Sequence, residues 1–246
     1  MTTDELNTDN KDAVAGLTVD ESEVAFFAKI ADSWWEPSGP FKPLHQLHPT
    51  RLGYIRHEVC KHFSLDETLK PFTGLRLLDI GCGGGLISEP MCRLGADVVA
   101  VDASEKNIKT ASVHASEGGL EIDFRNNTAE ALAEAGEQFD VIINMEVIEH
   151  VADVSAYLAA CRKLMKPGGI MLLSTLNRTA KSYLFAIIGA EHILRWLPVR
   201  AHDWKKFLKP EELADAAKAA GFTPSDPTGF IMALSLIPIP EPTEPY

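Results

Sequence analysis

One stretch of this 246-residue sequence places a carboxylate just before four glycines, in the order Asp79, Gly81, Gly83, Gly84 and Gly85. Because glycine has no side chain, the backbone of such a stretch can approach a bound molecule closely. The apolar residues before the carboxylate are typical of a buried parallel strand, and open α/β sheets bind their ligands where such strands end. The stretch therefore predicts a site for a nucleotide-like ligand.

Two ligands of that kind compete for the stretch. A dinucleotide requires the spacing G-x-G-x-x-G, but the third glycine would fall at Leu86, and a carboxylate is unfavourable beside a pyrophosphate. S-Adenosylmethionine (SAM) instead carries a cationic amine and a sulfonium, and D-x-G-x-G is the pattern of the class I SAM-dependent methyltransferases. Asp102 follows Gly81 by 21 residues, close to the offset of ~20 at which an acidic side chain reaches ribose hydroxyls. We therefore predict SAM, held by Asp79, Gly81, Gly83 and Asp102, with NAD as the minor alternative.

An acidic run that ends in histidine follows a second apolar stretch, Phe139–Asn144. If this run forms a helix, Glu146, Glu149 and His150 lie on one face, because they stand at i, i+3 and i+4. Two carboxylates and an imidazole form a reasonable site for a divalent cation, with magnesium, manganese or zinc as candidates. Alternatively, the glutamates stabilise the helix N-terminus and His150 acts as a general base. The residues alone leave both interpretations open.

Strands and helices must alternate along the chain to position these two groups of residues. Ser104 is expected to cap a helix through Ala115, and Lys166-Pro-Gly-Gly169 to form a turn. Repeated β–α units of this length predict an α/β fold, a Rossmann-like doubly wound sheet with mostly parallel strands. Short apolar runs predict its strands at residues 75–80, 97–101, 122–124, 139–144 and 170–174.

The region before the first strand is expected to be helical. Thr18-Val-Asp-Glu21 has the spacing of a capping box, and the apolar residues after it predict one helix to about Trp35. A second helix is expected to run toward Phe63. This region either covers the ligand loop as a lid or packs against the edge of the sheet. At the other end, Pro210 opens a last helix, which Gly221 ends.

Charge and cysteine content exclude several classes of protein. The formal charge of −12 argues against a general nucleic-acid-binding protein. Half of that charge lies in the first 23 residues, so we expect residues 1–17 to be a disordered acidic tail. The four cysteines include no C-x-x-C pair, which indicates neither a zinc cluster nor a disulfide framework. Without an apolar signal or spanning segment, the sequence predicts a cytoplasmic protein.

The segment 178–209 has the opposite charge from the rest of the chain. It contains seven Lys and Arg residues against Glu191 and Asp203, a net charge of +5, and it also carries Tyr183, Trp196 and many aliphatic residues. Basic flanks and interfacial aromatic residues are typical of a helix that lies on a membrane surface. The alternative is an insertion that covers the active site with its apolar face inward. The charge reversal favours the membrane, so we expect peripheral association with its inner face.

Seven motifs of the chain together resemble the ubiquinone biosynthesis O-methyltransferase family, over residues from about 25 to 230. Two of them are much more specific than the glycine loop, namely Ser174-Thr-Leu-Asn-Arg178 and His202-Asp-Trp-Lys-Lys-Phe207. The others are Phe41–His45, Pro49–Ile55, Leu78–Gly85, Met145–Val151 and Lys166–Gly169.

The resemblance implies that SAM binds at Arg51, Gly81, Asp102 and Met145, and that the last strand of the sheet is antiparallel. We expect a single methyltransferase domain at residues 18–230. It comprises N-terminal helices at 18–70, a SAM-binding core at 75–175 and the basic apolar insertion at 177–209. The proline-rich residues 231–246 depart from the family pattern and cannot form a central strand.

The resemblance also implies a divalent cation, which we take to be Mg²⁺, at Glu146, Glu149 and His150. It implies polyprenyl catechol substrates and other enzymes of the ubiquinone pathway as partners. We therefore predict methyl transfer from SAM to a phenolic oxygen, both from 3-demethylubiquinol to ubiquinol and at the earlier 2-polyprenyl-6-hydroxyphenol step, with Glu149 and His150 as catalytic residues. The alternatives are a methyltransferase for a soluble small molecule and a SAM-fold binding protein without catalysis.

Overall fold

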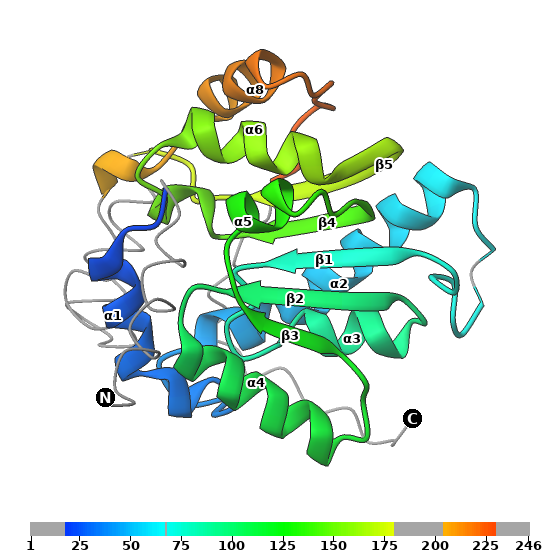
Figure 1. The fold of residues 1–246 in the computed structure, drawn as a ribbon, viewed down its shortest axis with the longest axis vertical. Helices are drawn as coiled ribbons and strands as arrows, with labels where there is room; N and C mark the ends of the chain where they lie inside the picture. The colour runs from blue at the N-terminus through cyan, green and yellow to red at the C-terminus, as the bar shows by residue number, and fades with distance from the viewer. Residues whose placement is uncertain (1–17, 67, 180–203, 230–246) are drawn as a thin grey trace, which may run out of the picture.

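A sheet of five parallel strands lies at the centre of the fold, in the order β3-β2-β1-β4-β5 (Figure 1). The computed structural model describes residues 18–66, 68–179 and 204–229. The predicted α/β class and its parallel sheet are confirmed, and each of the five strands predicted from short apolar runs is present. The strands are β1 (Arg76–Ile80), β2 (Asp97–Asp102), β3 (Asp123–Asn126), β4 (Phe139–Met145) and β5 (Met165–Ser174).

Successive residues of the central strands are buried on opposite faces of the sheet. Leu77 packs with α2 and α3 on one face, and Leu78 packs with α5 and α6 on the other. Helix α4 packs against β3, and α8 packs against α6 on its far side (Figure 1). The helices are α2 (Lys42–Phe63), α3 (Ser88–Arg93), α4 (Glu105–Glu117), α5 (Ala129–Glu134), α6 (Val154–Leu164) and α8 (Pro210–Ala219). The predicted helix toward Phe63, the helix capped by Ser104 and the last helix from Pro210 are therefore confirmed.

The first helix is shorter than predicted and begins later. Helix α1 spans Glu21–Lys29, and its N-cap is Asp20 rather than Thr18. A separate 3-10 helix, η1 (Ala31–Ser33), follows it, and the Ser33 hydroxyl donates to the Ile30 carbonyl at 2.7 Å in the turn between them. This break redirects the chain so that the next residues reach the glycine loop. Figure 1 shows α1 beside the arrowheads of the strands, at the carboxyl edge of the sheet.

Strand β5 begins at Met165 rather than at Ile170. Met165 pairs with Phe139 and Ile170 with Val141, so residues 166–169 are accommodated opposite a single residue of β4. Gly168 has a φ of +79°, which permits this irregularity. The predicted turn at these residues is therefore a local irregularity within the strand rather than a loop before it.

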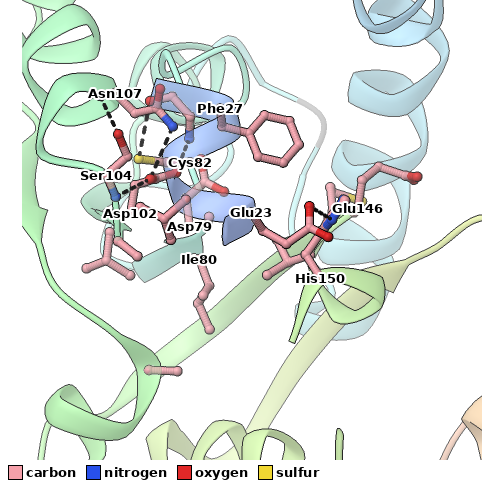
Figure 2. Close-up of a pocket in the computed structure, with 18 of the residues that line it drawn as sticks. Glu23, Phe27, Asp79, Ile80, Cys82, Asp102, Ser104, Asn107, Glu146 and His150 are labelled. Carbon is pink, nitrogen blue, oxygen red and sulfur yellow. Dashed lines mark hydrogen bonds and ion pairs between the residues drawn. The ribbon is translucent and has the colours of Figure 1, made fainter. Parts of the chain in front are cut away.

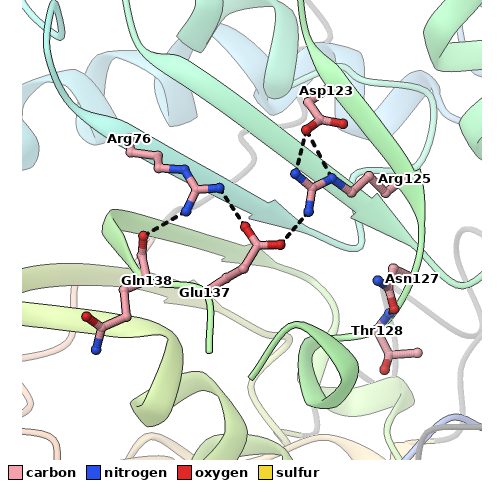
Figure 3. A network of polar contacts seen from close by, with 7 residues as sticks. All are labelled: Arg76, Asp123, Arg125, Asn127, Thr128, Glu137 and Gln138. Carbon is pink, nitrogen blue, oxygen red and sulfur yellow. Dashed lines mark hydrogen bonds and ion pairs between the residues drawn. The ribbon is translucent and has the colours of Figure 1, made fainter. Parts of the chain in front are cut away.

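An ion-pair network joins the start of β1 and strand β3 to the turn before β4. Glu137 accepts from Arg76 and from Arg125, each at 2.5 Å, and Arg125 also donates to Asp123 at 2.5 Å (Figure 3). These side chains come from the start of β1, from β3 and from the turn before β4. The network therefore joins strands on both sides of the sheet centre, at the edge opposite α1.

Several predicted features lie outside the described residues. These are the acidic tail at 1–17, most of the insertion at 177–209 and the proline-rich segment 231–246. The antiparallel last strand would follow α8; residues 222–229 form no strand, and the residues after them are not described. Among the helices of the described part, none is long and apolar enough to cross a bilayer.

Candidate active site

A cavity of about 230 Å³ opens at the carboxyl ends of β1, β2 and β4 (Figure 2). Parallel α/β sheets bind ligands at this edge, beside the point where the strand order reverses. Glu149 is 3% exposed and does not line the cavity. The other predicted site residues all line the cavity: Arg51, Asp79, Gly81, Gly83, Asp102, Met145, Glu146 and His150.

The glycine loop is shaped by side chains that press on it from the protein itself. A Cβ atom at Gly83 would lie 2.3 Å from the Trp34 ring, and one at Gly81 would lie 2.5 Å from a Val147 methyl group. Both glycines also have positive φ angles, +67° at Gly81 and +54° at Gly83. The glycines were expected to allow a ligand to approach the backbone, but part of this space is taken by Trp34. The segment before α2 therefore covers the loop as a lid would.

Asp79 lies at the end of β1 and is 3% exposed. One of its carboxylate oxygens accepts from the Ser88 hydroxyl at 2.5 Å. Burial, with a further contribution from the nearby charge of Asp102, raises the pKa of Asp79 to about 7. A buried carboxylate in this state gains most from a ligand that brings its own positive charge.

Asp102 ends β2 and is surrounded by hydrogen-bond donors. Its carboxylate accepts from the backbone N–H of Gly83 at 3.0 Å, from that of Ser104 at 2.8 Å and from the Asn107 amide at 3.2 Å. Burial raises its pKa despite these donors. Ser104 also caps α4 as predicted, by accepting from the Asn107 backbone N–H. The glycine loop, the end of β2 and the start of α4 are therefore fixed to one another through this carboxylate.

The segment after β4 does not form the helix on which the three-residue face depends. Glu146 has a φ of +57°, and only Ile148–His150 is helical, as a 3-10 turn. Glu146 therefore does not share a helical face with Glu149 and His150. Its carboxylate accepts from Arg51 at 3.1 Å and from the Ser174 hydroxyl at 2.7 Å.

Glu149 and His150 differ in their hydrogen bonding. Within the described part of the chain, Oε2 of Glu149 is buried and accepts no hydrogen bond. Burial and the neighbouring charge of Glu146 raise the Glu149 pKa. The Nδ1 atom of His150 lies 3.1 Å from a carboxylate oxygen of Glu23.

A buried, unpaired carboxylate oxygen beside a second carboxylate has the chemistry that a divalent cation requires. The pair of Glu146 and Glu149 therefore fits such an ion. Among the described residues, however, no three His, Cys, Asp or Glu side chains are grouped to hold one. The remaining ligands would come from the bound substrate or from His150.

Three residues of the site carried no functional prediction. Glu23 belongs to the acidic N-terminal run, Trp34 to the apolar face of the first helix, and Asn107 to a helix with no expected role. Trp34 donates to the Asn107 side chain at 3.0 Å, across 73 residues of sequence. Glu23 and His150 are 127 residues apart. No local spacing signals contacts of this range.

Comparison with known proteins identifies the family. A model described as "Methyltransferase domain" matches residues 52–225. The ubiquinone biosynthesis O-methyltransferase of Ruegeria pomeroyi is 59% identical over 215 residues, which cover 87% of this chain and 87% of that protein. The enzyme of the same name from Parvibaculum lavamentivorans is 57% identical over 222 residues, or 90% of this chain and 88% of the other.

The chain belongs to the ubiquinone biosynthesis O-methyltransferase family.

A solved structure shares the fold at much lower sequence identity. Magnesium protoporphyrin IX methyltransferase from Synechocystis PCC 6803, determined with bound SAH, is 21% identical and has a TM-score of 0.54, covering 72% of this chain and 73% of its own. Membership of the ubiquinone biosynthesis O-methyltransferase family makes the chain a SAM-dependent O-methyltransferase. SAM is therefore its methyl donor, as predicted, and the dinucleotide alternative is wrong.

Proposed function

We propose that this protein transfers the SAM methyl group to a phenolic oxygen of polyprenyl catechols in ubiquinone biosynthesis. The products would be ubiquinol, from 3-demethylubiquinol, and the methyl ether of the earlier 2-polyprenyl-6-hydroxyphenol intermediate. The observation that carries the proposal is identity above 55% to the family across nearly nine tenths of both chains. The acidic cavity at the carboxyl edge of the sheet supports it.

The donor half of the site would be formed by β1, β2 and the loop between β1 and α3. Asp79 would hold the cationic amine of SAM, and Asp102 would accept from the ribose hydroxyls. Gly81 and Gly83 supply backbone at the cavity wall. When bound, SAM supplies a methyl group on a positively charged sulfur.

Two further cavity residues are assigned to SAM by resemblance, Arg51 and Met145. Arg51 donates to Glu146, so it stands between the donor half of the site and the acidic run. Met145 ends β4 and lines the cavity between the two halves. Both residues would help to fix the methyl group in line with the acceptor oxygen, since positioning alone can account for much of the barrier to such a transfer.

The acceptor half would be formed by Glu146, Glu149 and His150. A phenol has a pKa of about 10, so little of it is ionised at neutral pH. A divalent cation, with Mg²⁺ as our choice, would supply positive charge that favours the ionised form of the substrate oxygen. Glu146 and Glu149 would hold that cation together with His150. Without a cation, His150 would take the phenolic proton as general base.

The basic apolar segment 178–209 would bring the enzyme to its substrate. Its net charge of +5 contrasts with −12 for the whole chain. Polyprenyl tails partition into bilayers, and a basic apolar surface binds the anionic inner leaflet. We propose peripheral attachment at the inner face of the membrane, where other enzymes of the pathway would supply and receive its substrates.

Methyl transfer from isotopically labelled SAM to a short-chain prenyl catechol tests the proposal. We expect label in the prenyl catechol, with mass spectrometry placing the methyl group on oxygen, and a lower rate after a chelator removes divalent cations. A soluble catechol without a prenyl chain serves as the control substrate. Label confined to the soluble catechol, or absent from both, would contradict the proposed substrate class.

A further inference from the structure

Helix α1 contacts the His150 ring at two points. Oε2 of Glu23 lies 3.1 Å from Nδ1, and the Phe27 ring packs edge-on against the imidazole, with 5.2 Å between centroids and 87° between planes (Figure 2). Glu23 and Phe27 are four residues apart on α1, so both side chains project from the same face of the helix. One contact fixes an edge of the imidazole ring and the other contact restricts its rotation.

The start of α1 is anchored to the segment that carries His150. Val19 and Val151 form an antiparallel bridge, and the Ala152 backbone N–H donates to the Thr18 carbonyl at 2.8 Å. No residue of α1 itself is buried. A helix that served only to complete the core would insert apolar side chains into it, whereas α1 directs a carboxylate and an aromatic ring at His150.

A lysine from a distant part of the chain holds the second oxygen of the Glu23 carboxylate. Nζ of Lys206, in the 3-10 helix η4 (Trp204–Lys206), lies 3.1 Å from Oε1 of Glu23 and 3.0 Å from a carboxylate oxygen of Asp20. With one oxygen on Lys206, Glu23 presents the other to His150. Three segments far apart in sequence therefore meet at one carboxylate.

We propose that Glu23 is a positioning residue for His150. It accepts the proton of Nδ1 and thereby leaves the lone pair of the neutral ring on Nε2, which is the form that a general base or a metal ligand requires. The proposal rests on the proposed function, because it assumes that His150 acts on the acceptor. Glu23 would act through His150 and would make no contact with the reacting atoms.

Kinetics of Glu23→Ala test the consequence for turnover. Loss of an outer partner of a catalytic or ligating histidine typically costs about 10- to 100-fold in activity. We expect kcat with a short-chain prenyl catechol to fall by that factor, with the KM for SAM nearly unchanged, and Glu23→Gln to recover part of the loss because its amide oxygen still accepts from Nδ1–H. Glu21→Ala is the matched control, since Glu21 lies in the same helical turn and is exposed.

The ring tautomer tests the proposal without any turnover. In ¹⁵N-histidine-labelled wild-type protein at pH 8, we expect His150 to carry its proton on Nδ1, and Glu23→Ala to lose this preference while Glu21→Ala keeps it. A His150 ring protonated on Nε2 alone in the wild type, or a tautomer unchanged in Glu23→Ala, would overturn the proposal. If the wild type transfers no methyl group to prenyl catechols, the proposed function fails, but the tautomer comparison still decides the role of Glu23.

Discussion

The amino edge of the sheet, where its strands begin, and the carboxyl edge, where they end, both carry carboxylates. The pKa values of these carboxylates are shifted in opposite directions at the two edges. At the amino edge, burial raises the pKa of Glu137, but hydrogen bonds from Arg76 and Arg125 lower it by a larger amount, so the net shift is downward. At the carboxyl edge, burial dominates and raises the pKa of Asp79 and of Glu149. The difference separates charges that stabilise the fold from charges that cost stability and gain a positively charged partner only when a ligand binds.

The largest effect should come from removing a carboxylate of the acceptor half. Glu149→Gln keeps the shape of the side chain but removes its charge, so we expect methyl transfer to fall by about 100-fold or more. SAM affinity, measured by calorimetry, should stay within about twofold of wild type, because Glu149 lies outside the donor half. Glu137→Gln is the matched substitution at the other edge and should leave the rate unchanged. Full turnover by Glu149→Gln would rule out the proposed cation site.

A smaller effect is expected at the donor half. Asp79→Asn removes one charge-assisted interaction with the SAM amine, worth about 1.5–3 kcal/mol, so affinity should weaken roughly 10- to 100-fold. The pKa of Asp79 is raised to about 7, and the amine favours its ionised form. Wild-type affinity should therefore fall as the pH decreases from 7.5 to 6. Titration calorimetry of SAM binding over that pH range checks both the loss of affinity and the pH dependence. If Asp79→Asn bound SAM with wild-type affinity and the same pH dependence, Asp79 would not belong to the donor half.

The smallest effect is expected at the amino edge. Glu137→Ala breaks two ion pairs of a partly exposed network, so the free energy of unfolding at pH 7 should fall by on the order of 1 kcal/mol. Because the pKa of Glu137 is lowered in the fold, this contribution is present above its unfolded value of about 4.3 and is lost as the pH falls through the folded value. Urea denaturation at pH 7 and pH 3 checks the direction; an equal loss at both would show that packing rather than charge is involved.

Local patterns were sufficient to predict the core of the fold. The apolar runs before Asp79 and before Asp102 predicted β1, β2 and the position of both carboxylates, because each run depends on residues close in sequence. The irregularity at residues 166–169 was not predicted, since Pro and Gly also signal a loop. Whether such residues lie in a loop or in a strand depends on the pairing with β4.

Contacts between distant segments set the limit of prediction at the site. The positive φ of Glu146 follows from how the chain leaves β4, and helical spacing alone gave a different geometry. The hydrogen bonds from Trp34 to Asn107 and between Glu23 and His150 join elements that only the folded sheet brings together. Residue types therefore indicated the chemistry of the site, whereas the side chains that contact its residues could be identified only from the tertiary structure.

Paired unfolding measurements on Asp79→Asn and Glu137→Gln, at pH 8 and without SAM, test the contrast between the edges most directly. Because the pKa of Asp79 is raised to about 7, ionisation of this carboxyl lowers the free energy of unfolding as the pH rises from its unfolded value of about 3.9 through 7, and the full loss is present at pH 8. We therefore predict that Asp79→Asn increases the free energy of unfolding by on the order of 1 kcal/mol, while Glu137→Gln decreases it by a similar amount. A decrease in both variants would contradict the account, because it would show that Asp79 stabilises the fold as Glu137 does.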